Sequence, residues 1–435
     1  MRLNQWPTAI PGAQAVIIAL ALSATMALAA EPEPIHRVSS EVCETCHQDI
    51  YRQWKGSMHA QSTALSDPIH GVFYKQEVGD PSAEGMLHKK SGKFPICLQC
   101  HAPNAARDKT TKLDALPAYS EGVNCVACHT LKDYKGIKGE NGKIRYGLMA
   151  YEVADRLQGP VGFPRGLQQL TASEDLFGGA TTTNSDDQKP NPHLGEPVEL
   201  GGKSIPALEL EPNSIQLRTS DACMGCHDQR DNPKGVPLCQ TGGEFVESGS
   251  RVACQTCHMP VAGGFADHTM GGGHHDAMLE RSVVFDLKTK AAGDAIKTRV
   301  QIRNLQPHAM PTGAPFRNLH LTLTAYDATG NVLWQNADGH PSDDDPQAYF
   351  AYGLADDKGH PAPPPTATKP GKDTRLKPHE IRDLEYEIPA KGVALVRAEL
   401  YYNLLWPSLA KKFDQLPKEV TSPVLIAVAE DQIED

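Results

Sequence analysis

Ten of the eleven cysteines form five pairs in which two residues separate the thiols, and a histidine follows every pair directly. Two thiols at this spacing can add to the two vinyl groups of one porphyrin, and the next residue then lies under the iron. We therefore interpret each motif as the attachment site of one c-type haem, and number the sites one to five along the chain. The thiols are those of Cys43, Cys46, Cys97, Cys100, Cys125, Cys128, Cys223, Cys226, Cys254 and Cys257. The proximal iron ligands are His47, His101, His129, His227 and His258.

Zinc sites and disulfides are the alternative interpretations of these cysteines. A zinc site takes four ligands from two such pairs, which leaves the fifth pair without a role and does not explain a histidine after every pair. Disulfides are common in exported chains, but they need no histidine either. Five covalently attached haems are therefore the favoured cofactors.

The five motifs are crowded along the chain. All lie within residues 30–280, which leaves about 50 residues for each haem. So little chain cannot enclose each porphyrin in a core of its own, and we expect the haems to bury one another's apolar surface. The short intervals from Cys97 to Cys125 and from Cys223 to Cys254 predict two close pairs, sites two with three and four with five. A series of porphyrins in contact conducts electrons.

The remaining histidines outnumber the irons, so a second histidine is available for each iron. Ligation by two histidines gives low-spin irons of fairly low potential. His59 is a favoured distal ligand, because it follows a predicted helix whose apolar face contains Tyr51, Trp54 and Met58. The other favoured distal ligands are His88, His268, His274 and His308. Four further histidines near the motifs are alternatives: His36, His70, His193 and His275.

Cys239 lies outside the motifs. It is either a small buried side chain or a redox-active or iron-binding thiol close to sites four and five.

Residues 1–29 have the features of a secretory signal peptide. Arg2 precedes a stretch, residues 13–30, that is almost wholly apolar or small, and Ala27-Leu28-Ala29 is a suitable cleavage site. An uncleaved anchor is the alternative, but the stretch is short for a bilayer. We expect the mature chain to have no transmembrane segment and to be periplasmic or exported to the cell surface.

The net charge is −11 at pH 7. This charge disfavours nucleic acid and anionic membranes as partners. We expect redox proteins as partners, with an oligomer or a surface assembly as a further alternative.

Site one, with Tyr51, Trp54, Ser57 and His59 after it, and residues 122–129 and 254–260 resemble the cytochrome c-554 and hydroxylamine oxidoreductase group of multihaem cytochromes. The resemblance covers roughly residues 38–260. It implies a mostly helical, loop-rich fold with closely stacked haems, and it implies that His59 ligates a haem other than its own. Some members of this group relay electrons, and others react with hydroxylamine, nitrite or nitric oxide at an open iron. This chain differs from the group in having five sites, and it lacks the Cys-x-x-Cys-Lys motif of the pentahaem nitrite reductases.

The chain after Arg281 has a different residue pattern. Apolar and polar residues alternate with a period of two in six runs, which predicts half-buried strands. The runs begin near Val283, Thr298, Leu319, Leu384, Val396 and Val424. Residues 327–331 predict a turn, and the proline-rich residues 341–375 predict a long irregular loop.

These patterns predict a signal peptide over residues 1–29, a mostly helical and irregular pentahaem domain over 30–280, and an all-β immunoglobulin-like sandwich over 281–435. The favoured function is electron transfer between periplasmic or cell-surface redox partners. An oxidoreductase acting on hydroxylamine, nitrite or nitric oxide at one five-coordinate haem is the alternative, so an electron carrier is favoured over a catalyst.

Overall fold

The computed structural model describes residues 33–159, 191–213, 215–413 and 415–433, so the predicted signal peptide lies outside the described residues. Pro34–Asp435 form one compact unit. In these described ranges, no helix is both long and apolar enough to cross a membrane.

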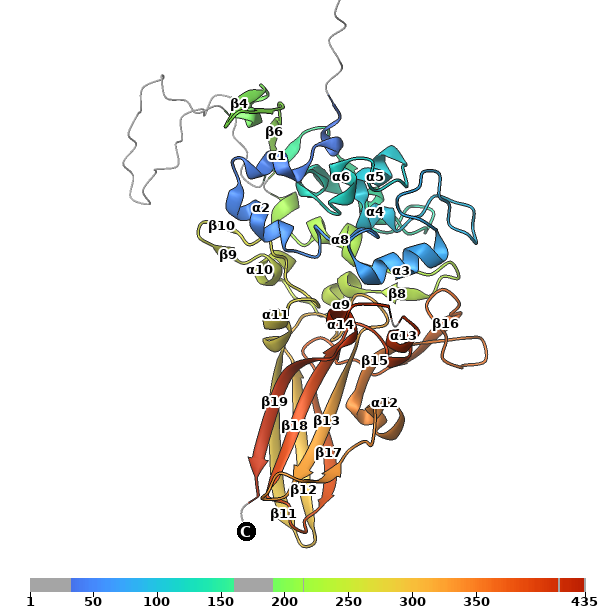
Figure 1. Cartoon of the computed structure of the whole chain (residues 1–435), viewed down its shortest axis with the longest axis vertical. Coiled ribbons are helices and arrows are strands. Elements are labelled where there is room, and N and C mark those ends of the chain that lie inside the picture. Colours follow the sequence, from blue (N-terminus) through green and yellow to red (C-terminus); the bar gives the residue numbers. More distant parts are fainter. Residues whose placement is uncertain (1–32, 160–190, 214, 414, 434–435) are drawn as a thin grey trace, which may run out of the picture. The chain divides into compact units, whose positions relative to one another are not determined.

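Short helices dominate the first part of the unit (Figure 1). The α-helices are α1 (Ser40–Glu44), α2 (Gln48–Lys55), α3 (Pro68–Glu77), α4 (Leu98–His101), α5 (Pro103–Asp108), α6 (Pro117–Ser120), α7 (Cys125–His129), α8 (Asp221–His227), α9 (Thr241–Glu247), α10 (Cys254–His258) and α11 (Asp276–Glu280). The 3-10 helices are η1 (Ile35–Arg37), η2 (Gly147–Ala150), η3 (Pro192–Leu194) and η4 (Gln216–Arg218). Helices this short are marginal in water, so their stability comes from packing and from capping.

Five two-stranded ladders connect these helices. Their strands are β1 (Leu131–Tyr134), β2 (Tyr151–Val153), β3 (Leu157–Gly159), β4 (Val198–Leu200), β5 (Lys203–Ile205), β6 (Leu210–Pro212), β7 (Arg230–Asp231), β8 (Pro237–Cys239), β9 (Val261–Ala262) and β10 (Phe265–Ala266). The mostly helical and irregular character predicted for this region is confirmed, with these small ladders added.

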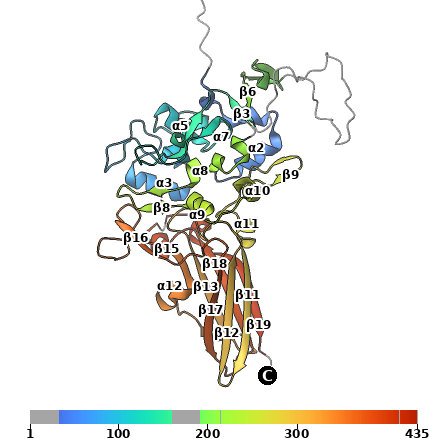
Figure 2. The same cartoon turned by 180° about the vertical axis from the view of Figure 1, so that it is seen from behind.

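Long strands form the second part of the unit, beginning at Val283 (Figures 1 and 2). They are β11 (Val283–Ala292), β12 (Ala295–Asn304), β13 (Asn318–Tyr326), β14 (Val332–Gln335), β15 (Tyr349–Ala355), β16 (Lys369–Asp373), β17 (Ile381–Pro389), β18 (Leu395–Asn403) and β19 (Val424–Gln432). One sheet has the order β11-β12-β17, and the other has the order β16-β15-β13-β18-β19 with β14 paired to β13. Short helices α12 (Pro341–Asp344), η5 (Pro346–Ala348), α13 (Pro407–Lys412) and α14 (Lys418–Thr421) join them.

The two sheets share one apolar core, which makes this part a sandwich. Ile296, Val300 and Ile302 alternate inward along β12, and Leu321 and Leu400 face each other in the register of β13 with β18. All five are fully buried in the same cluster. The predicted sandwich is therefore confirmed, and all six predicted strands are present as β11, β12, β13, β17, β18 and β19.

The prediction of one irregular loop over residues 341–375 was wrong. This segment contains α12, η5, β15 and β16, and β15 pairs with both β13 and β16. In β15 the buried positions do not alternate with a period of two, and β16 is exposed throughout and contains Pro370 and Gly371. Both features hide a strand from a search based on alternation and propensity.

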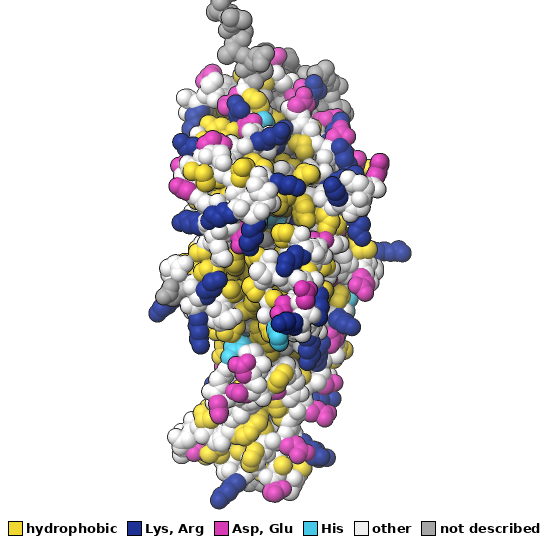
Figure 3. Space-filling view, turned by 90° about the vertical axis from the view of Figure 1, so that its right-hand side faces the viewer, with side chains coloured by type: hydrophobic (Ala, Val, Ile, Leu, Met, Phe, Trp, Pro, Cys, Tyr) yellow, Lys and Arg dark blue, Asp and Glu magenta, His cyan; other side chains and the backbone are white. Residues whose placement is uncertain are grey.

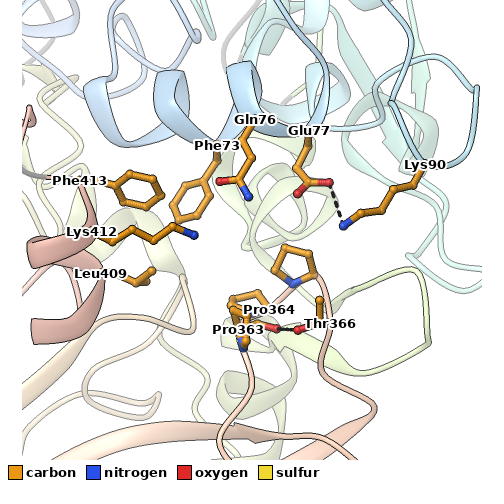
Figure 4. A pocket seen from close by; sticks show the side chains of 11 residues that line it. Phe73, Gln76, Glu77, Lys90, Pro363, Pro364, Thr366, Leu409, Lys412 and Phe413 are labelled. Carbon is orange, nitrogen blue, oxygen red and sulfur yellow. Dashed lines mark hydrogen bonds and ion pairs between the residues drawn. The ribbon is translucent and has the colours of Figure 1, made fainter.

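Aromatic side chains connect α3 to the sandwich region. Phe73 stacks on Phe316 and meets Phe413 edge to face, each with ring centroids 5.4 Å apart. Next to these rings, an open hollow of about 440 Å³ lies between α3, residues 363–366 and α13 (Figure 4). The segment before α11 is also tightly packed, since a Cβ atom at Gly273 would lie 2.4 Å from the hydroxyl oxygen of Tyr402.

Charged side chains of both signs are interspersed over the face drawn in Figure 3. The negative net charge of the chain is therefore not gathered into one patch on this face.

Candidate functional site

The five Cys-x-x-Cys-His motifs all lie on single helical turns. The histidine is the last residue of α4, α7, α8 and α10, and His47 lies between α1 and α2. In site one the amide of His47 donates to the carbonyl oxygen of Cys43 at 2.9 Å. A turn of helix places residues three apart on one face, so both thiols of a motif can reach the same porphyrin edge.

Thiols of different sites contact one another. All eleven cysteines are free. The neighbouring thiol of Cys125 of site three is the main cause of a raised pKa at Cys43 of site one, and Cys226 of site four is the main cause of a pKa of about 6 at Cys100 of site two. In the same way, Cys254 of site five is the main cause of a raised pKa at Cys223 of site four.

These contacts revise the expected pairing of sites. Sites four and five lie together, as their sequence interval predicted. Sites two and three were expected to form the other pair, but the thiol contacts join site two to site four and site three to site one.

Four of the motif histidines each face a second histidine. The ring centroids are separated by 6.0 Å for His47 and His193, 5.9 Å for His227 and His59, 6.4 Å for His258 and His308, and 4.1 Å for His101 and His70. An imidazole nitrogen binds a metal at about 2.0–2.1 Å, so two rings on opposite sides of one iron have centroids about 6.2–6.4 Å apart. Three of the separations fit one iron, and the rings of His70 and His101 must separate by about 2 Å to hold one.

His129 has His268 as its neighbour. The pKa of His129 is lowered to about 4, mainly by burial, and the charges that His268, His47 and His193 would carry contribute to this lowering. Burial likewise lowers the pKa of His59 to about 4 and of His227 to about 3. These imidazoles are therefore neutral at pH 7, which is the state that binds a metal.

Hydrogen bonds assign the tautomer of seven of these histidines. The Nδ1 atoms of His70, His101, His129, His193, His258, His268 and His308 each lie 2.6–3.1 Å from a backbone carbonyl oxygen. A carbonyl oxygen only accepts, so Nδ1 carries the hydrogen and Nε2 keeps its lone pair for a metal. This is the usual arrangement of a metal-ligating histidine, and the Nε2 atom of His70 is buried with no hydrogen-bond partner.

Other candidate histidines have different surroundings. The Nδ1 atom of His88 accepts from the amide of Ser91, and its Nε2 atom lies 3.7 Å from Glu77. His275 likewise accepts at Nδ1, from the amide of Met278. His36 pairs with Asp108 through Nε2 at 2.9 Å. The side chain of His274 is exposed, and its pKa is lowered by partial desolvation and then by the charge of Arg317.

Comparison with known proteins agrees with this geometry. Residues 42–130 match the family described as cytochrome c554 and c-prime. The chain is similar to the crystal structure of a penta-haem cytochrome c552 from Thermochromatium tepidum, with 75% identity and a TM-score of 0.86, over 92% of this chain and 100% of that chain. The chain belongs to the penta-haem cytochrome c552 family.

Two further comparisons add no argument. A DUF1425 family member from Shewanella sp. pv-4 matches 28% of this chain and 74% of its own length, at 16% identity and a TM-score of 0.15. None of the curated proteins matches the chain.

The predicted cofactor, covalently bound haem c, follows for this penta-haem cytochrome. His70 and His193 were only alternatives from the sequence, yet both share a local feature. His70 follows Asp67-Pro68 and His193 follows Asn191-Pro192, and each Asp or Asn side chain caps the amide of the histidine. A capping residue followed by proline starts a helix, so this pattern marks a histidine on the rigid first turn of a helix.

Cys239 lies in β8, half-buried, with its sulfur 3.6 Å from the hydroxyl oxygen of Thr241. Its role as a packing residue or a reactive thiol stays a prediction.

Proposed function

We propose that the chain relays electrons between redox protein partners through five closely spaced haems. Haem c at each site supplies a one-electron carrier. The ten motif cysteines hold the five haems, and His47, His101, His129, His227 and His258 are the proximal ligands. The thiol contacts between sites carry the proposal, because they join porphyrin edges from different sites.

The distal ligands that the geometry supports are His193 for site one, His70 for site two, His268 for site three, His59 for site four and His308 for site five. Four of them, His193, His70, His59 and His308, face a motif histidine, and His268 lies close enough to His129 for its charge to influence the pKa of His129. Four of the five donate through Nδ1 to a carbonyl oxygen. His88 is not included, because its Nδ1 atom accepts a hydrogen bond. His274 is not included either, because its neighbour is the cation of Arg317.

Site four is the junction of the relay. Its two thiols contact Cys100 of site two and Cys254 of site five. Cys223 and Cys226 also lie near Cys128 of site three. The other thiol of site three, Cys125, lies near Cys43 of site one. Sites one and three therefore form one branch, and sites two and five are the ends of two further branches.

The expectations on location and domain division accompany this proposal. A signal peptide over residues 1–29, an exported location, and a boundary between residues 280 and 281 all suit a cytochrome whose haem region ends before β11. The four imidazole pairs, with His268 near His129 as a fifth ligand candidate, support a relay over reaction with hydroxylamine, nitrite or nitric oxide at an open iron.

Electron paramagnetic resonance of the oxidised protein, followed by addition of carbon monoxide to the reduced protein, tests the proposal. We expect five haems by pyridine haemochrome assay, only low-spin signals by electron paramagnetic resonance, and no carbon monoxide binding. One high-spin haem that binds the gas would overturn the relay in favour of the oxidoreductase, and three or fewer haems would overturn the pentahaem assignment.

A further inference from the structure

The distal ligand of site five comes from the sandwich, whereas its proximal ligand comes from the haem region. His308 lies on the segment that joins β12 to β13, and its ring is nearly parallel to that of His258, at 21°. The position of His308 relative to the iron therefore depends on how this segment is held against the haem region.

A carboxylate of the haem region holds the segment. Glu244 lies on α9, and its Oε2 atom accepts from the amide of Ala309 at 3.1 Å and from the hydroxyl of Thr312 at 2.7 Å. These two residues flank the bend that follows His308. Ala309 also accepts from Nδ1 of His308 at 3.0 Å, so one residue joins the carboxylate to the imidazole.

Arg375 holds the same segment from the sandwich side. Its Nη1 atom lies 2.7 Å from Oε1 of Glu244 and 3.4 Å from the carbonyl oxygen of Pro311. Two bonds to Asp373 and the ring of Tyr352, 4.9 Å from its guanidinium carbon, fix the Arg375 side chain. The Glu244 and Arg375 side chains are only 10% and 11% exposed, so water screens this pair weakly.

We propose that Glu244 and Arg375 are positioning residues that hold His308 on the iron of site five. The inference rests on the proposed assignment of His308 as a distal ligand. Both carboxylate oxygens must accept, because they face an amide, a hydroxyl and a guanidinium group. An amide at position 244 would turn its NH₂ group toward one of these donors and release either the His308 segment or Arg375.

The test compares Glu244→Gln and Thr312→Val with wild type, each as the full haem-loaded chain. Thr312→Val keeps the side-chain shape and removes one bond to Glu244, together with the bond between the hydroxyls of Thr312 and Thr241. We expect both variants to retain five haems and, unlike wild type, to bind carbon monoxide at one haem. The rate should be about tenfold or more higher in Glu244→Gln than in Thr312→Val, because Glu244→Gln disturbs more of the bonds that the carboxylate accepts. The control is Glu430→Gln, which breaks the exposed Arg397–Glu430 pair on the sandwich and should react like wild type.

His308→Ala separates the two levels of the argument. If it leaves all five haems low-spin and unreactive, the ligand assignment fails and the inference fails with it. If it opens one haem while Glu244→Gln and Thr312→Val both react like wild type, the ligand assignment holds and the positioning role is overturned. An equal gain of carbon monoxide binding in Glu430→Gln would also overturn the positioning role. If Glu244→Gln loses haem, carbon monoxide binding by Thr312→Val tests the positioning role instead.

Discussion

The imidazole rings of His59 and His227 lie with their centroids 5.9 Å apart and their planes at 86°. His59 follows α2, next to site one, whereas His227 ends α8 in site four. Under the ligand assignment that we propose, a histidine next to one site serves the iron of another. This contact ties the first helices of the chain to a segment far along the sequence.

His59→Ala should convert one haem of five from low-spin to high-spin. The variant removes one of the two nitrogen ligands that we assign to site four, and alanine offers no replacement. Paramagnetic resonance of the oxidised protein and carbon monoxide binding to the reduced protein measure the change. His88→Ala is the matched control and should leave all five haems low-spin, and spectra that are alike for both variants would remove His59 from the ligand set.

His268→Ala and His274→Ala should differ although both residues precede α11. His268 donates through Nδ1 to the carbonyl oxygen of Ala266, which leaves Nε2 for the iron of site three. His274 neighbours Arg317 and belongs to none of the imidazole pairs that we assign. We expect one high-spin haem in His268→Ala and none in His274→Ala, and the reverse result would exchange the two assignments.

Gly225→Ala should destabilise site four. A Cβ atom there would lie 2.0 Å from the ring of Tyr151, whose hydroxyl oxygen accepts from the Gly225 amide at 2.7 Å. Overpacking of this kind costs about 1–3 kcal/mol, to be measured as a shift in the urea midpoint. Gly272→Ala is the control, because no atom lies within 4 Å of its Cβ position, and equal midpoints for the two variants would contradict the packing argument.

The sandwich should lose stability in acid through His320. Its pKa is lowered to about 4 by burial and then by the charge of His340, whereas an unfolded chain has a histidine pKa of about 6.5. The unfolded state therefore takes up the proton first, and stability falls as the pH drops from about 6.5 to about 4, by roughly 3 kcal/mol in total.

Guanidinium unfolding at several pH values, followed by the fluorescence of Trp334, measures this loss. His320→Gln keeps an acceptor for the bond from Asn403 but removes the titrating group. We expect a flatter pH dependence in this variant, and equal slopes would exclude His320 as the cause.

The attachment sites could be predicted from the sequence because the chemistry of haem attachment is local. Two thiols and an imidazole on one helical turn need no distant partner, so the motif alone predicts an attachment site. The strands of the sandwich core could also be predicted, because buried and more exposed residues alternate along strands such as β12, with Ile296, Val300 and Ile302 on its buried face.

The distal ligands could not be predicted from the sequence in the same way. His88 and His70 both lie near motifs, but the fold places the ring of His70 against the motif histidine His101 and places His88 beside Glu77. Their hydrogen bonds at Nδ1 also differ, because His88 accepts there, whereas His70 donates. That bond depends on which carbonyl or amide the fold brings close. The spatial order of the sites was hidden for the same reason, because the contact of Cys43 with Cys125 arises only after the chain has folded back.

The sulfur contacts between sites also constrain how the molecule can be made. Sulfurs that touch when their thiols are free would close into disulfides between sites in any compartment that oxidises thiols. Cys43 with Cys125, Cys100 with Cys226 and Cys223 with Cys254 are three such crosslinks, and each would remove two attachment points at once. Attaching haem to each motif before the sites come together would avoid these crosslinks, so we expect covalent haem attachment to precede folding of the haem region.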